Sequence, residues 1–214
     1  MTTPPPSTVL QVDGLTFGYP GQAALFADWS SRVPPGVTLV RGGESAGKTT
    51  LLRLLAGDLA AQAGEMRING VTLGAQPAAY RQQVFWNNPR TDAFDQVTVL
   101  DYLASLHPLY PAFDQQAVPA LLEGLSLTEH QHKPLYMLST GSKRKVWLTA
   151  AFASGAALTL LDDPFAALDK VSIGLVLQLL EQDAAKPGAT RAWVLADYQV
   201  PGKLPLAATI DLGD

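Results

Sequence analysis

The sequence predicts an α/β fold with a mostly parallel sheet, an N-terminal antiparallel β region and a helical insertion. Two observations predict it. Short β-prone runs alternate with helical periods at both ends of the chain, and the middle part is helical alone. The 214 residues are 47% hydrophobic and 16% charged, which is enough apolar material for one folded domain with a sizeable core. We therefore expect a single domain over 1–214.

The first 85 residues are expected to hold the antiparallel region and the start of the parallel sheet. The β-prone runs cover residues 9–12, 15–17, 31–33, 37–40 and 84–86. Apolar side chains at 51, 52, 54 and 55 predict a helix over 49–56, which Gly57 ends. The pair Asn69-Gly70 within 65–73 predicts a β-hairpin, because this pair favours the two-residue turn between antiparallel strands.

The remaining residues are expected to hold the helical insertion and then the rest of the sheet. Helical periods cover 99–106, 116–122, 142–152 and 171–180, and buried-strand patterns cover 157–161 and 192–196. The expected organisation is a core of residues 1–85 and 155–214, with a helical subdomain at about 86–154. The Pro-rich first six residues are expected to form a loose tail.

Composition excludes several classes of protein. Without cysteine, the chain cannot hold a disulfide scaffold, a thiolate zinc site or a cysteine nucleophile. The net charge of −4 and the lack of a basic patch argue against a nucleic-acid partner. The N-terminus lacks the features of a signal peptide, and the most apolar stretch, 148–161, is shorter than the roughly 18 residues of a membrane span. We expect a cytoplasmic protein whose membrane role, if any, is peripheral.

A phosphate-binding loop follows the predicted strand 37–40. Residues 42–49 match G-x-x-x-x-G-K-[ST] between a strand and a helix, which is the context that this pattern requires. Main-chain N–H groups would bind the β-phosphate, Lys48 would place a cation on the β- and γ-oxygens, and the Thr49 hydroxyl would bind Mg²⁺. The predicted nucleotide contacts are Gly42, Gly43, Glu44, Ser45, Ala46, Gly47, Lys48, Thr49 and Thr50. The pattern narrows the fold to a P-loop NTPase core.

Two adjacent carboxylates, Asp162 and Asp163, stand at the end of the predicted strand 157–161. Asp162 would reach Mg²⁺ directly or through water. At a strand end the next residue can turn toward the phosphates, which makes Asp163 the candidate base. The alternative is a solvated acidic turn before Pro164, and the phosphate-binding loop weighs against it.

The segment 138–142, Leu-Ser-Thr-Gly-Ser, precedes a predicted helix. Here the sequence resembles the ATP-binding-cassette (ABC) ATPases, whose signature L-S-G-G-Q it matches at the Leu, the Ser and the second Gly. The resemblance implies that Ser139, Thr140, Gly141 and Ser142 contact ATP. Ser139 could equally cap the helix, and one residue can do both, since a helix N-terminus with a free hydroxyl favours anions.

Further positions extend the resemblance over essentially the whole chain. Tyr19 is similar to the aromatic residue on which the adenine ring stacks, although it could instead be a turn aromatic that covers the sheet edge. The segment 166–169 resembles the D-loop beside the second nucleotide motif. Asp169 could also cap the helix that follows.

Three departures from the family lie at the γ-phosphate end of the site. Asp163 stands where the family has a glutamate, one methylene longer, and Asp197 stands where the family has a histidine. The three histidines, His107, His130 and His132, all fall in the helical insertion. The family's glutamine after strand 84–86 is replaced by Asn88, a third candidate Mg²⁺ ligand, or by a shifted Gln96. With Asp163 and Asp197 as the candidate catalytic residues, we expect slow hydrolysis.

The resemblance implies the ATP-binding subunit of an ABC transporter, with ATP and Mg²⁺ as cofactors. Two cassettes, as a homodimer or a heterodimer, would hold ATP between them and drive separate transmembrane permease subunits, which would dock around 87–96. The short form is similar to cassettes that export antibiotics, lipids or haem. The alternative is a degenerate nucleotide-binding regulatory subunit with little or no hydrolysis. A cassette of DNA repair or translation would need long coiled-coil insertions or a second cassette.

Overall fold

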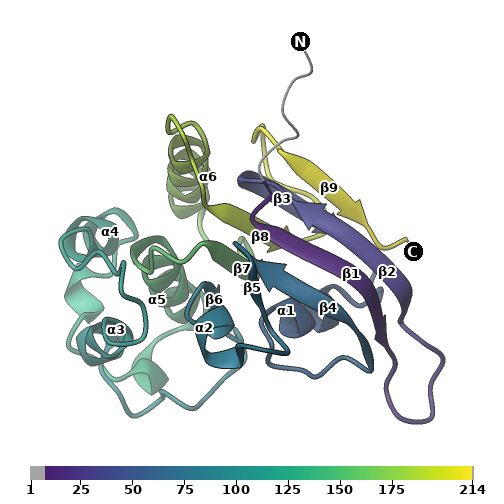
Figure 1. The fold of residues 1–214 in the computed structure, drawn as a ribbon. Helices are drawn as coiled ribbons and strands as arrows, with labels where there is room; N and C mark the ends of the chain where they lie inside the picture. The colour runs from purple at the N-terminus through teal and green to yellow at the C-terminus, as the bar shows by residue number, and fades with distance from the viewer. Residues whose placement is uncertain (1–7, 214) are drawn as a thin grey trace.

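The computed structural model describes residues 8–213, so the predicted N-terminal tail lies outside the described residues. These residues form two sheets and a group of helices (Figure 1). The strands are β1 (Leu10–Phe17), β2 (Phe26–Val33), β3 (Gly36–Arg41), β4 (Ala63–Ile68), β5 (Val71–Thr72), β6 (Val84–Trp86), β7 (Leu158–Asp162), β8 (Ala192–Ala196) and β9 (Ala208–Asp211). The α-helices are α1 (Lys48–Leu55), α2 (Pro77–Arg81), α3 (Val99–Leu106), α4 (Val118–Gly124), α5 (Thr140–Ala153) and α6 (Lys170–Ala184).

The antiparallel sheet has the strand order β2-β1-β4-β5. Its β4–β5 hairpin turns at Asn69 and Gly70, both with positive φ, as the sequence predicts. The strand β2 begins at Phe26, well before the β-prone run 31–33, because pairing with β1 extends the strand through polar, exposed positions. The predicted antiparallel start is confirmed, and its second strand is longer than expected.

The second sheet is parallel throughout, in the order β6-β7-β8-β3-β9. Its central strands are buried on both faces, which is why they read as continuous apolar runs. The edge strand β9 and the short helix α2 are absent from the sequence expectations. The strand β9 also meets the loop after β3, since the Gly43 N–H donates to the Gly213 carbonyl over 3.0 Å.

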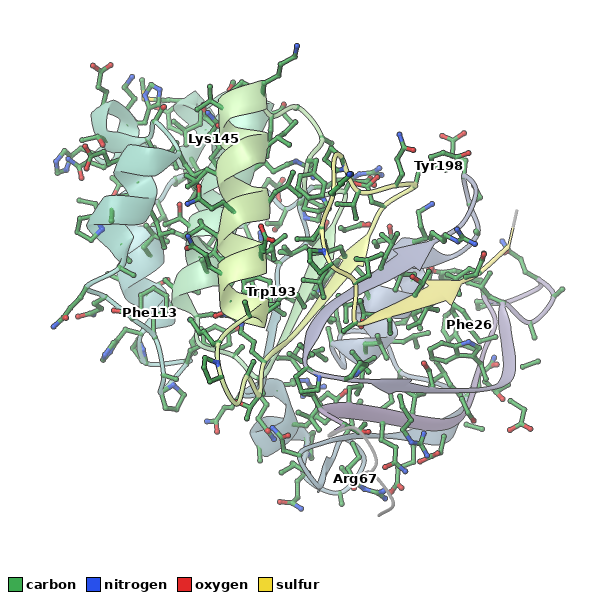
Figure 2. The ribbon with its side chains drawn as sticks, turned by 90° about the horizontal axis from the view of Figure 1, so that it is seen from above. Phe26, Arg67, Phe113, Lys145, Trp193 and Tyr198 are labelled. Atoms are coloured by element: carbon green, nitrogen blue, oxygen red, sulfur yellow. The ribbon has the colours of Figure 1, made fainter. Side chains whose placement is uncertain are left out.

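Two apolar cores lie on opposite faces of this sheet. One joins the sheet to α3–α6 and contains Trp193, and the other joins it to α1 and the antiparallel sheet. Figure 2 shows this division: Phe113 lies among the helices, Phe26 and Arg67 lie on the side of the antiparallel sheet, and Trp193 lies between. Within residues 8–213, no helix is long and apolar enough to cross a membrane.

A buried arginine joins the helical insertion to the parallel sheet. The Arg191 guanidinium donates to the carbonyls of Ala151 and Phe152 at the end of α5, and to the Thr159 hydroxyl on β7. It also lies 3.9 Å from the ring centre of Trp193. Burial lowers the pKa of Arg191 to about 10. The end of α5 is therefore tied to β7 and β8 by polar contacts as well as by packing.

The sheet topology determines where the candidate functional residues lie. The strands β3, β7 and β8 are neighbours and run parallel, so their carboxyl ends open at the same edge of the sheet. The phosphate-binding loop follows β3, Asp163 follows β7, and Asp197 follows β8. Ligands of parallel α/β sheets bind at this edge.

Candidate nucleotide-binding site

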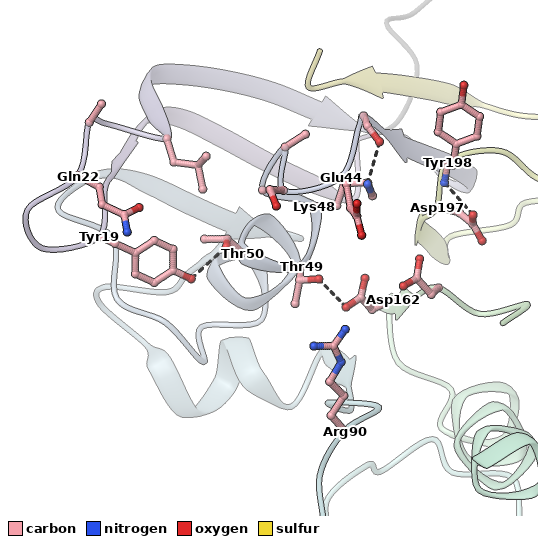
Figure 3. Close-up of a pocket in the computed structure, with 17 residues that line it drawn as sticks. Tyr19, Gln22, Glu44, Lys48, Thr49, Thr50, Arg90, Asp162, Asp197 and Tyr198 are labelled. Atoms are coloured by element: carbon pink, nitrogen blue, oxygen red, sulfur yellow. Dashed lines mark hydrogen bonds between the residues drawn. The ribbon is translucent and has the colours of Figure 1, made fainter. Parts of the chain in front are cut away.

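A cavity of about 650 Å³ opens at the carboxyl ends of these strands (Figure 3). It is polar, and it is lined by the loop between β1 and β2 of the antiparallel sheet and by the ends of strands of the parallel sheet. The lining residues are Tyr19, Gln22, Ala23, Leu25, Gly42, Glu44, Ser45, Ala46, Gly47, Lys48, Thr49, Thr50, Arg90, Asp162, Asp163, Asp197 and Tyr198. Most of the residues predicted to bind nucleotide therefore surround one cavity.

The phosphate-binding loop has a backbone that requires glycine at its end. Gly47 has φ +92°, and a Cβ atom there would lie 2.8 Å from the Leu25 side chain. The helix α1 begins at the next residue, so its free N–H groups and its positive dipole end face the cavity. The Lys48 ammonium donates to the carbonyls of Gly42 and Gly43, each over 2.8 Å. This geometry suits an anion.

Thr49 and Asp162 form an oxygen pair at the floor of the cavity. The Thr49 hydroxyl donates to Asp162 Oδ2 over 2.7 Å, which joins α1 to the end of β7 (Figure 3). Burial raises the pKa of Asp162, while the Thr49 hydrogen bond opposes that shift. Hydroxyl and carboxylate oxygens are the ligands that Mg²⁺ takes beside phosphates and water, so the pair fits this ion.

Asp163 leaves the strand in a left-handed turn with φ 45°. Its N–H donates to the Ala196 carbonyl over 2.9 Å, and the residue lines the cavity. From α5, the Arg144 guanidinium donates to the carbonyls of Asp162 and Asp163. The turn is thus held from the helical insertion.

Asp197 lies in the same cavity. Its Oδ1 accepts a hydrogen bond from the Tyr198 N–H over 2.7 Å. Burial raises the pKa of Asp197, and the Asp163 carboxylate raises it further. Among residues 8–213, no lysine, arginine or histidine forms an ion pair with it. A carboxylate without such a partner among these residues therefore lines the cavity.

Tyr19 lies at the other end of the cavity. Its hydroxyl is 3.0 Å from the Thr50 hydroxyl, and its ring meets Phe17 edge-on. With 37% of its surface exposed, Tyr19 lines the cavity more openly than a core aromatic would. The geometry agrees with a stacking residue.

The four signature residues do not line this cavity. Ser139 caps α5, because its Oγ accepts from the Ser142 N–H over 3.1 Å. Gly141 lies so close to the D-loop that a Cβ atom would be 2.4 Å from the Ala167 carbonyl oxygen. Asp169 caps α6 and pairs with Lys145 over 2.7 Å. Within one chain, the signature and the phosphate-binding loop belong to different surfaces.

The loop after β6 places a residue in the cavity that the sequence reasoning missed. Arg90 lines the cavity, whereas Asn88 and Gln96, the candidates for a Mg²⁺-binding amide, are not among the lining residues. The Asn88 Oδ1 accepts instead from the Arg90 N–H over 3.0 Å. No motif marks Arg90, and only its position beside Asp162 in space identifies it.

Comparison with known proteins supports the same family. The sequence profile of the ABC transporter family matches residues 27–166. The cytochrome c biogenesis ATP-binding export protein CcmA of Pseudomonas savastanoi pv. phaseolicola is 32% identical over 211 residues, which are 98% of this chain and 97% of that protein. The protein of the same name from Rhodospirillum rubrum is 32% identical over 188 residues, 87% of this chain and 80% of that protein.

Solved structures give the same result for the fold. The structure of the ATP-binding subunit of an ABC transporter matches with a TM-score of 0.80 at 25% identity, over 89% of this chain and 80% of that one. An ABC transporter ATP-binding protein from Pyrococcus furiosus matches with a TM-score of 0.75 at 23% identity, over 95% and 96% of the two chains. The chain belongs to the ABC transporter family, as an ATP-binding subunit with the family's ATPase fold.

Proposed function

We propose that this chain binds Mg²⁺-ATP in the described cavity and hydrolyses it slowly to drive a transporter. The observation that supports this most strongly is the meeting of Lys48, Thr49 and Asp162 at the N-terminus of α1. When bound, Mg²⁺ would neutralise phosphate charge, with Thr49 and Asp162 as its protein ligands. Tyr19 would stack against adenine, and Lys48 would exchange loop carbonyls for phosphate oxygens.

The proposed hydrolysis is slow because of two carboxylates at the γ-phosphate end. Asp163 would orient the attacking water and accept its proton, but its side chain is one methylene shorter than the family's glutamate. Asp197 would repel the negative charge of the transferred phosphoryl group. Each lost contact could cost a few kcal/mol, or roughly two to three decades in rate. The second candidate, a regulatory subunit that binds ATP without turnover, rests on the same two residues.

The proposed partners are a second cassette, identical or related, and separate transmembrane permease subunits. The signature residues Ser139, Thr140, Gly141 and Ser142 would complete the partner cassette's site. A second cavity, of about 370 Å³, supports a docking groove between core and insertion, because Arg81, Trp86 and Tyr110 line it. It lies next to the loop 87–96, where we place the permease. The subunit would then work on the cytoplasmic face of the membrane, and the relatives' names suggest export in cytochrome c biogenesis as its process.

Calorimetry with Mg²⁺-ATP tests this proposal. We expect Lys48→Ala to weaken ATP binding about tenfold or more, since the charged hydrogen bonds of one ammonium are lost. Lys186→Ala is the matched control, because Lys186 is exposed and pairs with Asp183 on α6, away from the cavity lining. Equal ATP affinity in the wild type and in Lys48→Ala would refute the site.

Phosphate release by the wild type, alone and with its membrane subunit, separates the two candidate functions. Slow release that the membrane subunit stimulates supports the transporter ATPase. No release under either condition supports the regulatory subunit. Release at the rate of a typical cassette would show that Asp163 and Asp197 are adapted to this site.

A further inference from the structure

One guanidinium group enters the cavity without a partner. Arg90 lines the cavity, and Figure 3 shows its side chain extending toward Thr49 and Asp162. In the part of the chain that the structure describes, no hydrogen bond or ion pair engages this guanidinium; only the main-chain N–H of Arg90 is bonded, to Asn88. A cation beside acidic groups that is not paired with any of them is available to a ligand.

The charges around the cavity explain why such a cation matters. Four carboxylates line it, those of Glu44, Asp162, Asp163 and Asp197, against two cationic side chains, Lys48 and Arg90. Lys48 is bonded to two loop carbonyls near the start of α1. The opposite wall holds the carboxylates of Asp162 and Asp163 and, at its end, Asp197. A triphosphate whose terminal group enters this wall meets three anions, and Arg90 is the cation of the lining that extends toward Asp162.

The main chain that carries Arg90 is already ordered. Asn88 closes a turn with its side chain on the Arg90 N–H over 3.0 Å and with its carbonyl on the Thr91 N–H over 3.0 Å. Further along the same loop, Asp95 pairs with Lys143 on α5 over 2.5 Å. The turn and the ion pair therefore hold the loop that carries Arg90 at two points.

From this arrangement we infer that Arg90 binds the γ-phosphate of ATP and supplies the positive charge that Asp197 cannot. The inference rests on the proposed function. A planar guanidinium can hold two phosphate oxygens at once, and it is always charged. Charge on the transferred phosphoryl group is spread over its equatorial oxygens in the transition state, so the contact would strengthen there. Arg90 would then be a catalytic residue that distinguishes ATP from ADP.

The test compares ATP with ADP in the full chain. We expect Arg90→Gln to weaken Mg²⁺-ATP binding about tenfold or more in calorimetry, while Mg²⁺-ADP binding changes less than about twofold. Phosphate release should fall by about a hundredfold, the cost of removing one preorganised charge contact. Arg90→Lys should restore part of the ATP affinity. Arg67→Gln, on β4 and paired with Glu65, is the control and should change none of these values.

Three results would overturn the inference. Equal ATP affinity in Arg90→Gln and the wild type, or equal losses for ATP and ADP, would show that Arg90 does not bind the γ-phosphate. A lower Mg²⁺ requirement in Arg90→Gln with unchanged ATP affinity would make Arg90 a competitor of the metal at Asp162. Lys48→Ala keeps the two proposals distinguishable, because it should weaken both nucleotides: if it does while Arg90→Gln has no effect, only the role of Arg90 is wrong.

Discussion

At the scale of single residues, the charge of one cavity side chain affects the stability of the protein. Asp197 is half-buried beside Asp163, without an ion-pair partner among residues 8–213. Its raised pKa means that the folded chain holds the proton more tightly than the unfolded chain does. The resulting stabilisation is present below the unfolded pKa, near 4, and is lost as the pH rises through the folded pKa. At neutral pH the ionised Asp197 therefore destabilises the ligand-free protein.

Neutralising this side chain should stabilise the protein without nucleotide. We expect Asp197→Asn to unfold at a higher Tm than the wild type at pH 7, because the amide has nearly the same shape and no charge. The difference should shrink as the pH falls toward 4. Thermal scans at both pH values measure it, with exposed Asp92→Asn as the control. A Tm difference that is independent of pH would show that the charge of Asp197 is not the cause.

At the scale of elements, the end of α5 is held by polar contacts with Arg191, the residue directly before β8. Arg191 donates to the Phe152 carbonyl, to the Ala151 carbonyl, which also accepts from Ser154, and to the Thr159 hydroxyl on β7. The helix that carries the signature residues at its start is thereby fixed to the sheet at its end.

We expect Arg191→Met to destabilise the protein by about 2–4 kcal/mol, because the Phe152 carbonyl and the buried Thr159 hydroxyl lose their donor. The exposed pair of Arg53 and Asp58 provides the control: Arg53→Met should cost at most about 1 kcal/mol. Urea unfolding followed by circular dichroism measures both values. A loss for Arg191→Met no larger than that of the control would mean that water replaces the arginine.

The elements that could be predicted are those whose structure is determined by residues near them in the sequence. The Asn69-Gly70 turn, the helix after Gly47 and the buried runs of β3, β7 and β8 are set by neighbouring residues. Strand β9 is short and paired on one side only, so its apolar pattern is weak, and pairing with β3 decides its structure. Arg90 was missed for a similar reason: its role depends on which strand end the loop passes, and this is a tertiary property.

At the scale of the whole molecule, the proposed function implies that each of two surfaces carries half of an ATP site. The phosphate-binding loop, Asp162 and Asp163 surround the cavity, while Ser139 and Gly141 lie outside it. The division into a core and a helical subdomain at about 86–154 stays a prediction. In that prediction, the signature residues belong to the helical subdomain. In this proposal, a second cassette would complete both surfaces.

We therefore expect ATP to promote dimerisation of Asp163→Asn, in which hydrolysis would be blocked and the bound state would persist. Light scattering should show a doubling of mass with Mg²⁺-ATP and a monomer without it. Lys48→Ala in the same background should stay monomeric, since ATP would no longer be held. A mass that ATP does not change in Asp163→Asn would favour a heterodimeric partner.

The hydrogen bond between Gly43 and Gly213 also sets an order of events during synthesis. The phosphate-binding loop leaves the ribosome early, but the strand β9 that supports it is made some 170 residues later, the separation that also divides Arg41 from its partner Asp211. Contacts between residues this distant in sequence form late in synthesis. At translation speeds of roughly 5–20 residues per second, β9 would be made many seconds after the loop. Nascent chains stalled before residue 208 should consequently fail to retain ATP, however well their earlier strands have folded.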